Sequence, residues 1–332
     1  MTLVDGDELG PEAESDDRCA ERGARAHDGG GHDSRGLRQV GTSPHPGSPP
    51  PTPYAARVST ALFRPALVTG ASSGIGLAIA HELARRGHSL VLVARDPGRL
   101  SVAERALRDA HGVAVQSIAL DLGEPFAAES LLARLAALRC PPLDVVVHNA
   151  GFGVLDPFAT CSPDTSDAML ALDVAFPVRF TRLVLPSMLE RRAGRILIVA
   201  STAAFQAGPF MAVYYASKAF VLSFAEAIAE ELRGSGVTVT ALCPGPVPTA
   251  FQARAGIGDA SLLTSLLAVS ASRVARAGVR GMERGRRVVV PGLLSRVAVQ
   301  ALRVLPRAFA ARVVRRMQEQ RGQRPAGATN QR

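Results

Sequence analysis

The chain has 332 residues, 47% of them hydrophobic, and a formal net charge of +9 at pH 7. This length allows one large α/β domain or two ordinary ones with a sizeable core. The four cysteines are too scattered for a metal site or a disulfide-rich secreted domain, so we expect a cytoplasmic protein without a metal. Neither a signal peptide nor an apolar run of about 18 residues is evident, so no membrane-spanning helix is expected.

Residues 1–60 differ in composition from the rest of the chain. They are rich in Gly, Pro, Ser, Asp and His, show no hydrophobic period, and contain 6 arginines against 10 acidic residues. Such a segment cannot bury enough apolar surface to offset the entropy lost on ordering. We therefore predict a disordered leader before a folded domain of residues 61–292. Whether the mature protein keeps this leader stays open.

The folded domain begins with a short apolar run, Ala66–Val68, followed by the glycine-rich segment T-G-A-S-S-G-I-G and an amphipathic run that ends near Gly87. Strand, glycine turn and helix together form the context of a dinucleotide-binding site. Glycines let the backbone approach a pyrophosphate, and the helix N-terminus offers unpaired N–H groups to it.

A second apolar strand, S-L-V-L-V-A, ends at Arg95. An acidic side chain at this place would bind the ribose 2′-hydroxyl of NAD, whereas an arginine suits the 2′-phosphate of NADP. Arg95 therefore favours NADP(H) over NAD(H). Asp96 keeps NAD(H) open, and so does the alternative that Arg95 is simply a solvated charge at the end of a strand.

Apolar strands and helices continue to alternate. We predict helices at 97–111 and 124–138 and strands at 113–120 and 143–147, a pattern typical of a parallel sheet covered on both faces. Ligands bind beyond the carboxyl ends of the strands in such a sheet. Asp121, Leu122 and the segment His148–Gly151 lie at these ends, so we place them near the cofactor, with His148 as a strand-end residue and not a catalyst.

The next segments carry the candidate catalytic groups. A helical run over 165–192, interrupted by Pro177 and Pro186, precedes a fifth strand that leads to Ser201. A helix with Tyr214 and Lys218 follows, and then a sixth strand, V-T-V-T-A-L-C, which leads into P-G-P-V-P-T.

Tyr214 and Lys218 are four residues apart, so on a helix their side chains share one face. An ammonium within a few ångström typically lowers the pKa of a phenol by about 1–3 units, which would tune Tyr214 for proton transfer. Lys218 is also the only lysine among the 38 basic Lys and Arg residues. The alternative is an ordinary exposed lysine on a helix.

These motifs together resemble the short-chain dehydrogenase/reductase family over about residues 64–292. The resemblance implies a single Rossmann-type doubly wound parallel sheet of about seven strands. It also implies carbonyl–alcohol interconversion by hydride transfer, with Tyr214 as general acid/base, Ser201 bonding the substrate oxygen, and Lys218 holding the nicotinamide ribose. The cofactor-binding residues implied are Gly70, Ser72, Ser73, Gly74, Ile75, Gly76, Arg95, Asp121, Leu122, Asn149, Ala150, Gly151, Tyr214, Lys218, Pro244, Gly245, Val247 and Thr249.

One position departs from the family pattern. Where the family usually has an asparagine before the catalytic serine, this chain has Asp173, which we count with the catalytic residues. Its carboxylate would either pair with Lys218, and so weaken the effect of the lysine on Tyr214, or relay protons itself. A helix residue facing solvent is the alternative.

Residues 250–269 occupy the place of the family's substrate lid and are mostly small and apolar, which favours an apolar or lipid-like small-molecule substrate. A non-catalytic NADP-binding sensor or scaffold is the alternative function, although such members of the family commonly lose the tyrosine or the lysine. The family often forms dimers or tetramers, so a homo-oligomer is also open.

Residues 273–332 contain 15 arginines and 2 acidic residues. We predict a last strand in R-R-V-V-V-P and a C-terminal helical extension over 293–332, in which Leu294, Val297, Ala301 and Leu305 recur at helical spacing and Pro306 kinks or divides the helix. This basic extension could pack on the domain as lid or oligomer contact, or bind peripherally to an anionic membrane. Nucleic-acid binding is disfavoured, because no recognition motif accompanies the charge.

Overall fold

A computed structural model of the chain describes residues 64–256 and 268–322. Both ranges belong to one compact unit, Ser59–Arg332. The predicted leader and residues 257–267 of the predicted lid lie outside the described residues. Within the described ranges, none of the helices combines the length and the apolar character that crossing a membrane requires.

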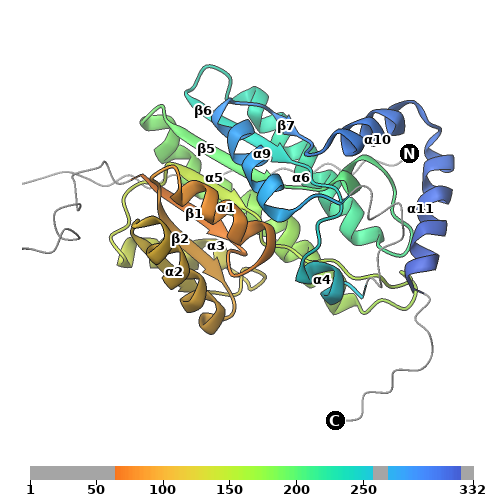
Figure 1. The fold of residues 1–332 in the computed structure, drawn as a ribbon, viewed down its shortest axis with the longest axis horizontal. Coiled ribbons are helices and arrows are strands. Elements are labelled where there is room, and N and C mark those ends of the chain that lie inside the picture. Colours follow the sequence, from red (N-terminus) through yellow and green to blue (C-terminus); the bar gives the residue numbers. More distant parts are fainter. Residues whose placement is uncertain (1–63, 257–267, 323–332) are drawn as a thin grey trace, which may run out of the picture. The chain divides into compact units, whose positions relative to one another are not determined.

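A seven-stranded sheet forms the centre of this unit, with the order β3-β2-β1-β4-β5-β6-β7 and every neighbouring pair parallel (Figure 1). The predicted fold is therefore confirmed. The chain winds outward from β1 to β3 and then returns to β4 on the other side of β1, so the strand order reverses between β1 and β4. Ligands of doubly wound sheets bind at such a reversal. The strands are Pro65–Thr69, Ser89–Ala94, Val115–Ala119, Val145–His148, Gly194–Val199, Val237–Leu242 and Val288–Val289.

Helices cover both faces of the sheet because both faces of the strands are apolar. Alternate strand residues belong to two separate cores, with Leu67 and Val91 on one side and Ala66 and Leu90 on the other. The first core is closed by α3 (Ala127–Ala137), α5 (Phe176–Glu190) and α6 (Ala212–Glu231). The second is closed by α1 (Gly74–Ala84), α2 (Pro97–His111) and α9 (Ala271–Glu283).

The predicted helical run over 165–192 is one continuous helical segment that contains a π-helical turn. Helix α4 (Pro163–Leu170) leads into the turn Ala171–Ala175, where the Phe176 N–H donates to the Ala171 carbonyl five residues back. Pro177 has no N–H to offer the carbonyl of Asp173, as a regular α-helix would require. The proline therefore does not break the helical segment, and the π-helical turn accommodates one extra residue at Asp173.

The C-terminal extension forms two helices, α10 (Leu293–Val304) and α11 (Arg307–Gly322), and Pro306 divides them as predicted (Figure 1). Helix α10 packs on the short turn Thr202–Phe205 that follows β5. Helix α11 reaches the start of α6, where its buried Gln318 Nε2 lies 3.2 Å from the Tyr215 hydroxyl and 3.3 Å from the Met211 sulfur. The extension thus covers the region around the first turn of α6.

The packing of Phe180 makes a first prediction. Its ring is fully buried in the first core and stacks on Phe176 at 5.6 Å between centroids, so Phe180→Ala removes a large apolar side chain and leaves a cavity. We expect the free energy of unfolding to fall by about 3–5 kcal/mol in urea denaturation. The exposed Phe158 is the control, and its change to alanine should cost about 0.5 kcal/mol or less. Equal losses for the two variants would contradict this packing.

Candidate active site

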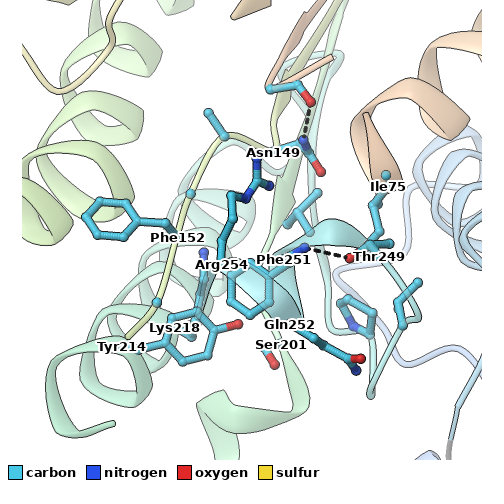
Figure 2. A pocket seen from close by; sticks show the side chains of 18 of the residues that line it. Ile75, Asn149, Phe152, Ser201, Tyr214, Lys218, Thr249, Phe251, Gln252 and Arg254 are labelled. Carbon is cyan, nitrogen blue, oxygen red and sulfur yellow. Dashed lines mark hydrogen bonds between the residues drawn. The ribbon is translucent and has the colours of Figure 1, made fainter. Parts of the chain in front are cut away.

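A cavity of about 770 Å³ lies where the strand order reverses, and its size suits a dinucleotide together with a small substrate. Loops that follow β1, β2, β3, β4, β5 and β6 form its walls, and the start of α6 lies on one side (Figure 2). The cavity is lined by all of the predicted cofactor-binding residues except Gly76, and by Ser201, Tyr214 and Lys218 among the predicted catalytic residues. The loops bring these segments together from distant parts of the chain.

The glycine loop between β1 and α1 has the shape that a pyrophosphate requires. Gly70 and Gly74 have φ values of +64° and +59°, which side chains rarely adopt. A Cβ on Gly76 would lie 2.4 Å from the Gly70 carbonyl oxygen, so only glycine allows this close turn. No side chain caps the N-terminus of α1 at Ser73, which leaves its first N–H groups for an anion. These residues fit a dinucleotide.

Asn149 lines the cavity, but its side chain holds the glycine loop in place. The Nδ2 group donates to the Thr69 and Gly70 carbonyls at 2.9 and 3.2 Å. Figure 2 shows Asn149 with one of these bonds. The Thr69 hydroxyl in turn accepts from the backbone N–H groups of Asn149 and Ala150 at 2.9 and 3.0 Å, and donates to the Val147 carbonyl at 3.1 Å. These bonds tie the ends of β1 and β4 together, so the amide of Asn149 shapes the cofactor site from behind.

Two arginines stand at the end of the cavity near β2 and β3. Arg95 is largely exposed, and its Nη1 lies 3.6 Å from the Asp121 carboxylate. Asp96 is already engaged, because its Oδ1 accepts from the Arg99 N–H at 3.0 Å as the N-cap of α2 and its Oδ2 lies 3.3 Å from Arg99 Nε. Arg95 and Arg99 are therefore the two cationic groups at this end of the cavity, and each lies beside a carboxylate.

Ser201, Tyr214 and Lys218 meet at the opposite end of the cavity. Helix α6 begins at Ala212, so Tyr214 and Lys218 lie one turn apart on it, as predicted. The Lys218 ammonium is 5.6 Å from the centre of the Tyr214 ring, and the Ser201 hydroxyl is hydrogen-bonded to the Tyr214 phenol. The neighbouring Tyr215 instead accepts a hydrogen bond from Gln318 of α11. Tyr214 is thus the tyrosine beside the serine and the lysine.

Asp173 is buried directly behind this group, so the interpretation as a solvent-facing residue is wrong. Its Oδ2 lies 3.2 Å from Lys218 Nζ and accepts from the Ser217 hydroxyl at 3.3 Å, while its Oδ1 accepts from the Phe152 N–H at 3.2 Å. The side chains of both ions are almost fully buried, at 0% exposure for Asp173 and 8% for Lys218. A Cβ on Gly151 would lie 2.6 Å from Asp173 Oδ1, so this glycine makes room for the pair.

The ion pair overturns the expectation that Lys218 makes Tyr214 more acidic. Burial raises the pKa of the Tyr214 phenol above its ordinary value, and the Asp173 carboxylate raises it further, while the hydrogen bond from Ser201 opposes both. Asp173 balances the charge of the ammonium, so little net positive charge acts on the phenol. Burial likewise raises the pKa of Asp173, and Lys218 opposes that shift.

His148 ends β4, as predicted, but its side chain is buried in the core and does not line the cavity, so its placement near the cofactor was wrong. Its Nε2 shares a hydrogen bond with the Thr181 hydroxyl at 3.0 Å, and burial lowers its pKa to about 3. The imidazole is therefore uncharged at neutral pH. Within residues 64–256 and 268–322, no group of three His, Cys, Asp or Glu side chains is placed to hold a metal ion.

The wall facing Tyr214 was not predicted residue by residue. The Phe251 ring of α7 (Ala250–Arg254) lies 5.5 Å from the Tyr214 ring, and Figure 2 shows Arg254 extending into the cavity from the same helix. A bond from the Leu155 N–H to the Ala255 carbonyl, 2.9 Å long, fixes the end of α7. Further cavity-lining residues that were not predicted come from three other segments and include Phe152, Gly153, Met211, Met317 and Gln318.

A comparison with known proteins agrees with this geometry. The model of the short chain dehydrogenase family matches residues 64–258. A very-long-chain 3-oxoacyl-CoA reductase of Anas platyrhynchos is 36% identical over 189 residues, which are 55% of this chain and 60% of that protein. The alignments with this and two other curated relatives span between 60% and 66% of the relatives' own length.

Solved structures show the same fold with either cofactor. A short-chain dehydrogenase from Sphingobium yanoikuyae in complex with NADPH has a TM-score of 0.64 and 30% identity, over 81% of this chain and 99% of that one. A protein of the same family from Burkholderia phymatum in complex with NAD has a TM-score of 0.63 and 27% identity, over 72% and 92%. Each cofactor is thus bound by a structural relative.

The buried pair leads to a prediction about Asp173. In Asp173→Asn the negative charge beside Tyr214 disappears while the ammonium stays, so the tyrosinate is favoured and the pKa of Tyr214 should fall by about one unit or more. The chain has no tryptophan, so tyrosinate absorbance at 295 nm can be followed directly. The Tyr214→Phe change is also made in the unchanged protein and in Asp173→Asn, and the absorbance that it removes identifies the Tyr214 signal.

Circular dichroism marks the pH of alkaline unfolding in each variant. Asp167→Asn is the matched control, because Asp167 is exposed on α4. The account fails if Tyr214 ionises at the same pH in Asp173→Asn, in Asp167→Asn and in the unchanged protein.

Proposed function

Because the chain belongs to the short-chain dehydrogenase family, we propose that it is an NADP(H)-dependent oxidoreductase that interconverts a carbonyl compound and an alcohol by hydride transfer. The observation that carries the proposal is the meeting of Ser201, Tyr214 and Lys218 in one cavity with the glycine loop. The loop supports the binding of a dinucleotide at one end, and the three side chains act on the substrate at the other.

Bound NADPH supplies the hydride that the carbonyl carbon receives. Tyr214 gives its phenolic proton to the carbonyl oxygen as the C=O π bond opens, and Ser201 donates a hydrogen bond to the same oxygen. Burial and Asp173 keep the phenol protonated at neutral pH. This state suits a proton donor, so we favour the reduction direction.

Lys218 and Asp173 serve the tyrosinate that remains after this transfer. The ammonium lies 5.6 Å from the centre of the ring, and it also binds the nicotinamide ribose as in the family. Asp173 contacts the ammonium directly, so it can help return a proton to Tyr214 through Lys218. In this role Asp173 is a positioning and relay residue behind the reacting atoms.

The preference for NADP(H) rests on the end of the cavity near β2. Arg95 and Arg99 both line it, and a 2′-phosphate needs such cationic partners. Asp96, the residue that could favour NAD(H), is engaged as the cap of α2 and by Arg99. An arginine that is largely exposed and only weakly held by Asp121 can turn toward the phosphate.

An apolar substrate suits the wall opposite Tyr214. Phe152, Met211, Phe251 and Met317 are large apolar side chains that line the cavity. A relative named as a very-long-chain 3-oxoacyl-CoA reductase supports a lipid-like carbonyl compound over a sugar. A non-catalytic sensor or scaffold would not need the preserved serine, tyrosine and lysine.

The role of Tyr214 is tested by two phenylalanine variants. Tyr214→Phe removes the proton donor, so NADPH oxidation with a panel of apolar ketones and aldehydes should fall by roughly 10²–10⁴-fold, while NADPH binding measured by fluorescence persists. Tyr215→Phe is the neighbouring control and should retain most of the turnover.

The reverse result would exclude Tyr214 as the proton donor. A protein that binds NADPH but turns over none of the panel would favour the sensor or scaffold.

The cofactor preference is tested at Arg95. Arg95→Ala should weaken NADPH binding about tenfold and leave NADH binding nearly unchanged, because only NADPH carries the 2′-phosphate that the guanidinium would contact. Arg105→Ala, an exposed arginine on α2, controls for the loss of one positive charge. Equal Kd changes for the two cofactors, or for the two variants, would show that Arg95 does not select NADP(H).

A further inference from the structure

The two C-terminal helices have an inner face that packs on the domain. On α10 the buried residues are Ser295 and Val299, one turn apart. On α11 they are Ala310, Val314 and Gln318, which repeat every four residues. The sequence left open whether this extension packs on the domain. The inner face of the two helices does so.

The opposite face of α10 is apolar and open to solvent, whereas the exposed side of α11 is mostly charged. Leu294, Val297 and Val304 are 56%, 59% and 84% exposed, and on α10 they recur at the three- and seven-residue spacing of one helix face. On α11, Phe309 is 52% exposed. Together these four residues are called the outer apolar stripe. Exposed apolar side chains that gather on one helix face often mark an interaction site.

Cationic side chains accompany the stripe, and acidic ones are nearly absent. Among the described residues of α10 and α11 the only acid is Glu319, which is paired with Arg315 at 2.8 Å. A second arginine, Arg296, donates to the Val290 carbonyl. Four further exposed arginines of these helices form no ion pair within the described residues: Arg303, Arg307, Arg312 and Arg316.

We propose that the outer apolar stripe and these four arginines bind the surface of a lipid bilayer with anionic headgroups. Helices that lie in the membrane interface combine an apolar face with arginines that contact acidic lipids. A second copy of this face is disfavoured as the occupant, because it would bring two clusters of arginines together. Nucleic acid would use the arginines but leave the apolar residues uncovered.

The position of α11 links this surface to the cavity. Its inner face contributes Met317 and Gln318 to the cavity wall, while Phe309 and Arg312 of the same helix lie on the exposed side. A bilayer bound to α10 and α11 would therefore lie one helix away from the substrate site. This arrangement suits an apolar substrate that is dissolved in the membrane, although binding to the bilayer does not depend on catalysis.

Vesicle flotation of the full chain tests the proposal. We expect binding to phosphatidylcholine vesicles that contain phosphatidylglycerol, and at least tenfold weaker binding to phosphatidylcholine alone. The double variant Val297→Glu with Val304→Glu should bind the anionic vesicles at least tenfold more weakly, because it places charges in the interface. Its charge-matched control is Val102→Glu with Phe158→Glu, both exposed elsewhere, which should bind like the unchanged protein.

The arginines are tested separately. Arg303→Gln with Arg312→Gln should reduce binding about fivefold for each arginine removed, and added salt should weaken binding by the unchanged protein. Arg105→Gln with Arg276→Gln removes two exposed arginines elsewhere and should have a much smaller effect. Thermal unfolding confirms that each variant is folded.

Three results would overturn the proposal. The unchanged protein could fail to float with the anionic vesicles. The apolar double variant could bind like its control while the arginine variant loses binding, which would indicate a surface for soluble polyanions. Light scattering could show that the apolar variant converts an oligomer to a monomer without any vesicle binding, which would assign the stripe to a second copy. None of these outcomes depends on turnover, so they leave the proposed reaction to its own tests.

Discussion

The buried contact between Lys218 and Asp173 is the interaction on which the catalytic end of the cavity depends. Two ions inside a protein are tolerated only when they are paired and hydrogen-bonded, and loss of one partner typically costs about 3–5 kcal/mol. Here the Phe152 N–H and the Ser217 hydroxyl complete the environment of the carboxylate. The pair lies against α6 one turn from Tyr214, so it sets the charge that the phenol experiences and orients the ammonium.

Several backbone features exist to admit this pair. The π-helical turn at Ala171–Ala175 carries Asp173 into the core, and Gly151 leaves space where any side chain would touch the carboxylate. A Cβ on the nearby Gly153 would lie 2.8 Å from the Tyr214 ring, so the loop after β4 must also approach the phenol closely. This loop therefore joins the cofactor end of the cavity to its catalytic end, which explains why two glycines stand there.

The fold and the main catalytic groups could be predicted because their signals are local. Apolar runs of strand length, the glycine loop and the four-residue spacing of Tyr214 and Lys218 each lie within one short segment. The direction of the Tyr214 pKa shift was predicted wrongly, because it depends first on burial, which the four-residue spacing with Lys218 does not reveal. The pairing of Lys218 with Asp173, 41 residues from Tyr214 in sequence, could be given from the sequence only as one of two alternatives. The contact of Gln318 with Tyr215 spans 103 residues and leaves no pattern, so the contribution of α11 to the cavity became visible only in the structure.

A crystal structure of the protein with NADP⁺ would test the central claim most directly. The account predicts the nicotinamide ring against Tyr214, its ribose hydroxyls bonded to Lys218, and the Lys218–Asp173 contact still in place. A nicotinamide ring bound away from Tyr214, or a Lys218 side chain that leaves Asp173 and makes no contact with the ribose, would contradict it.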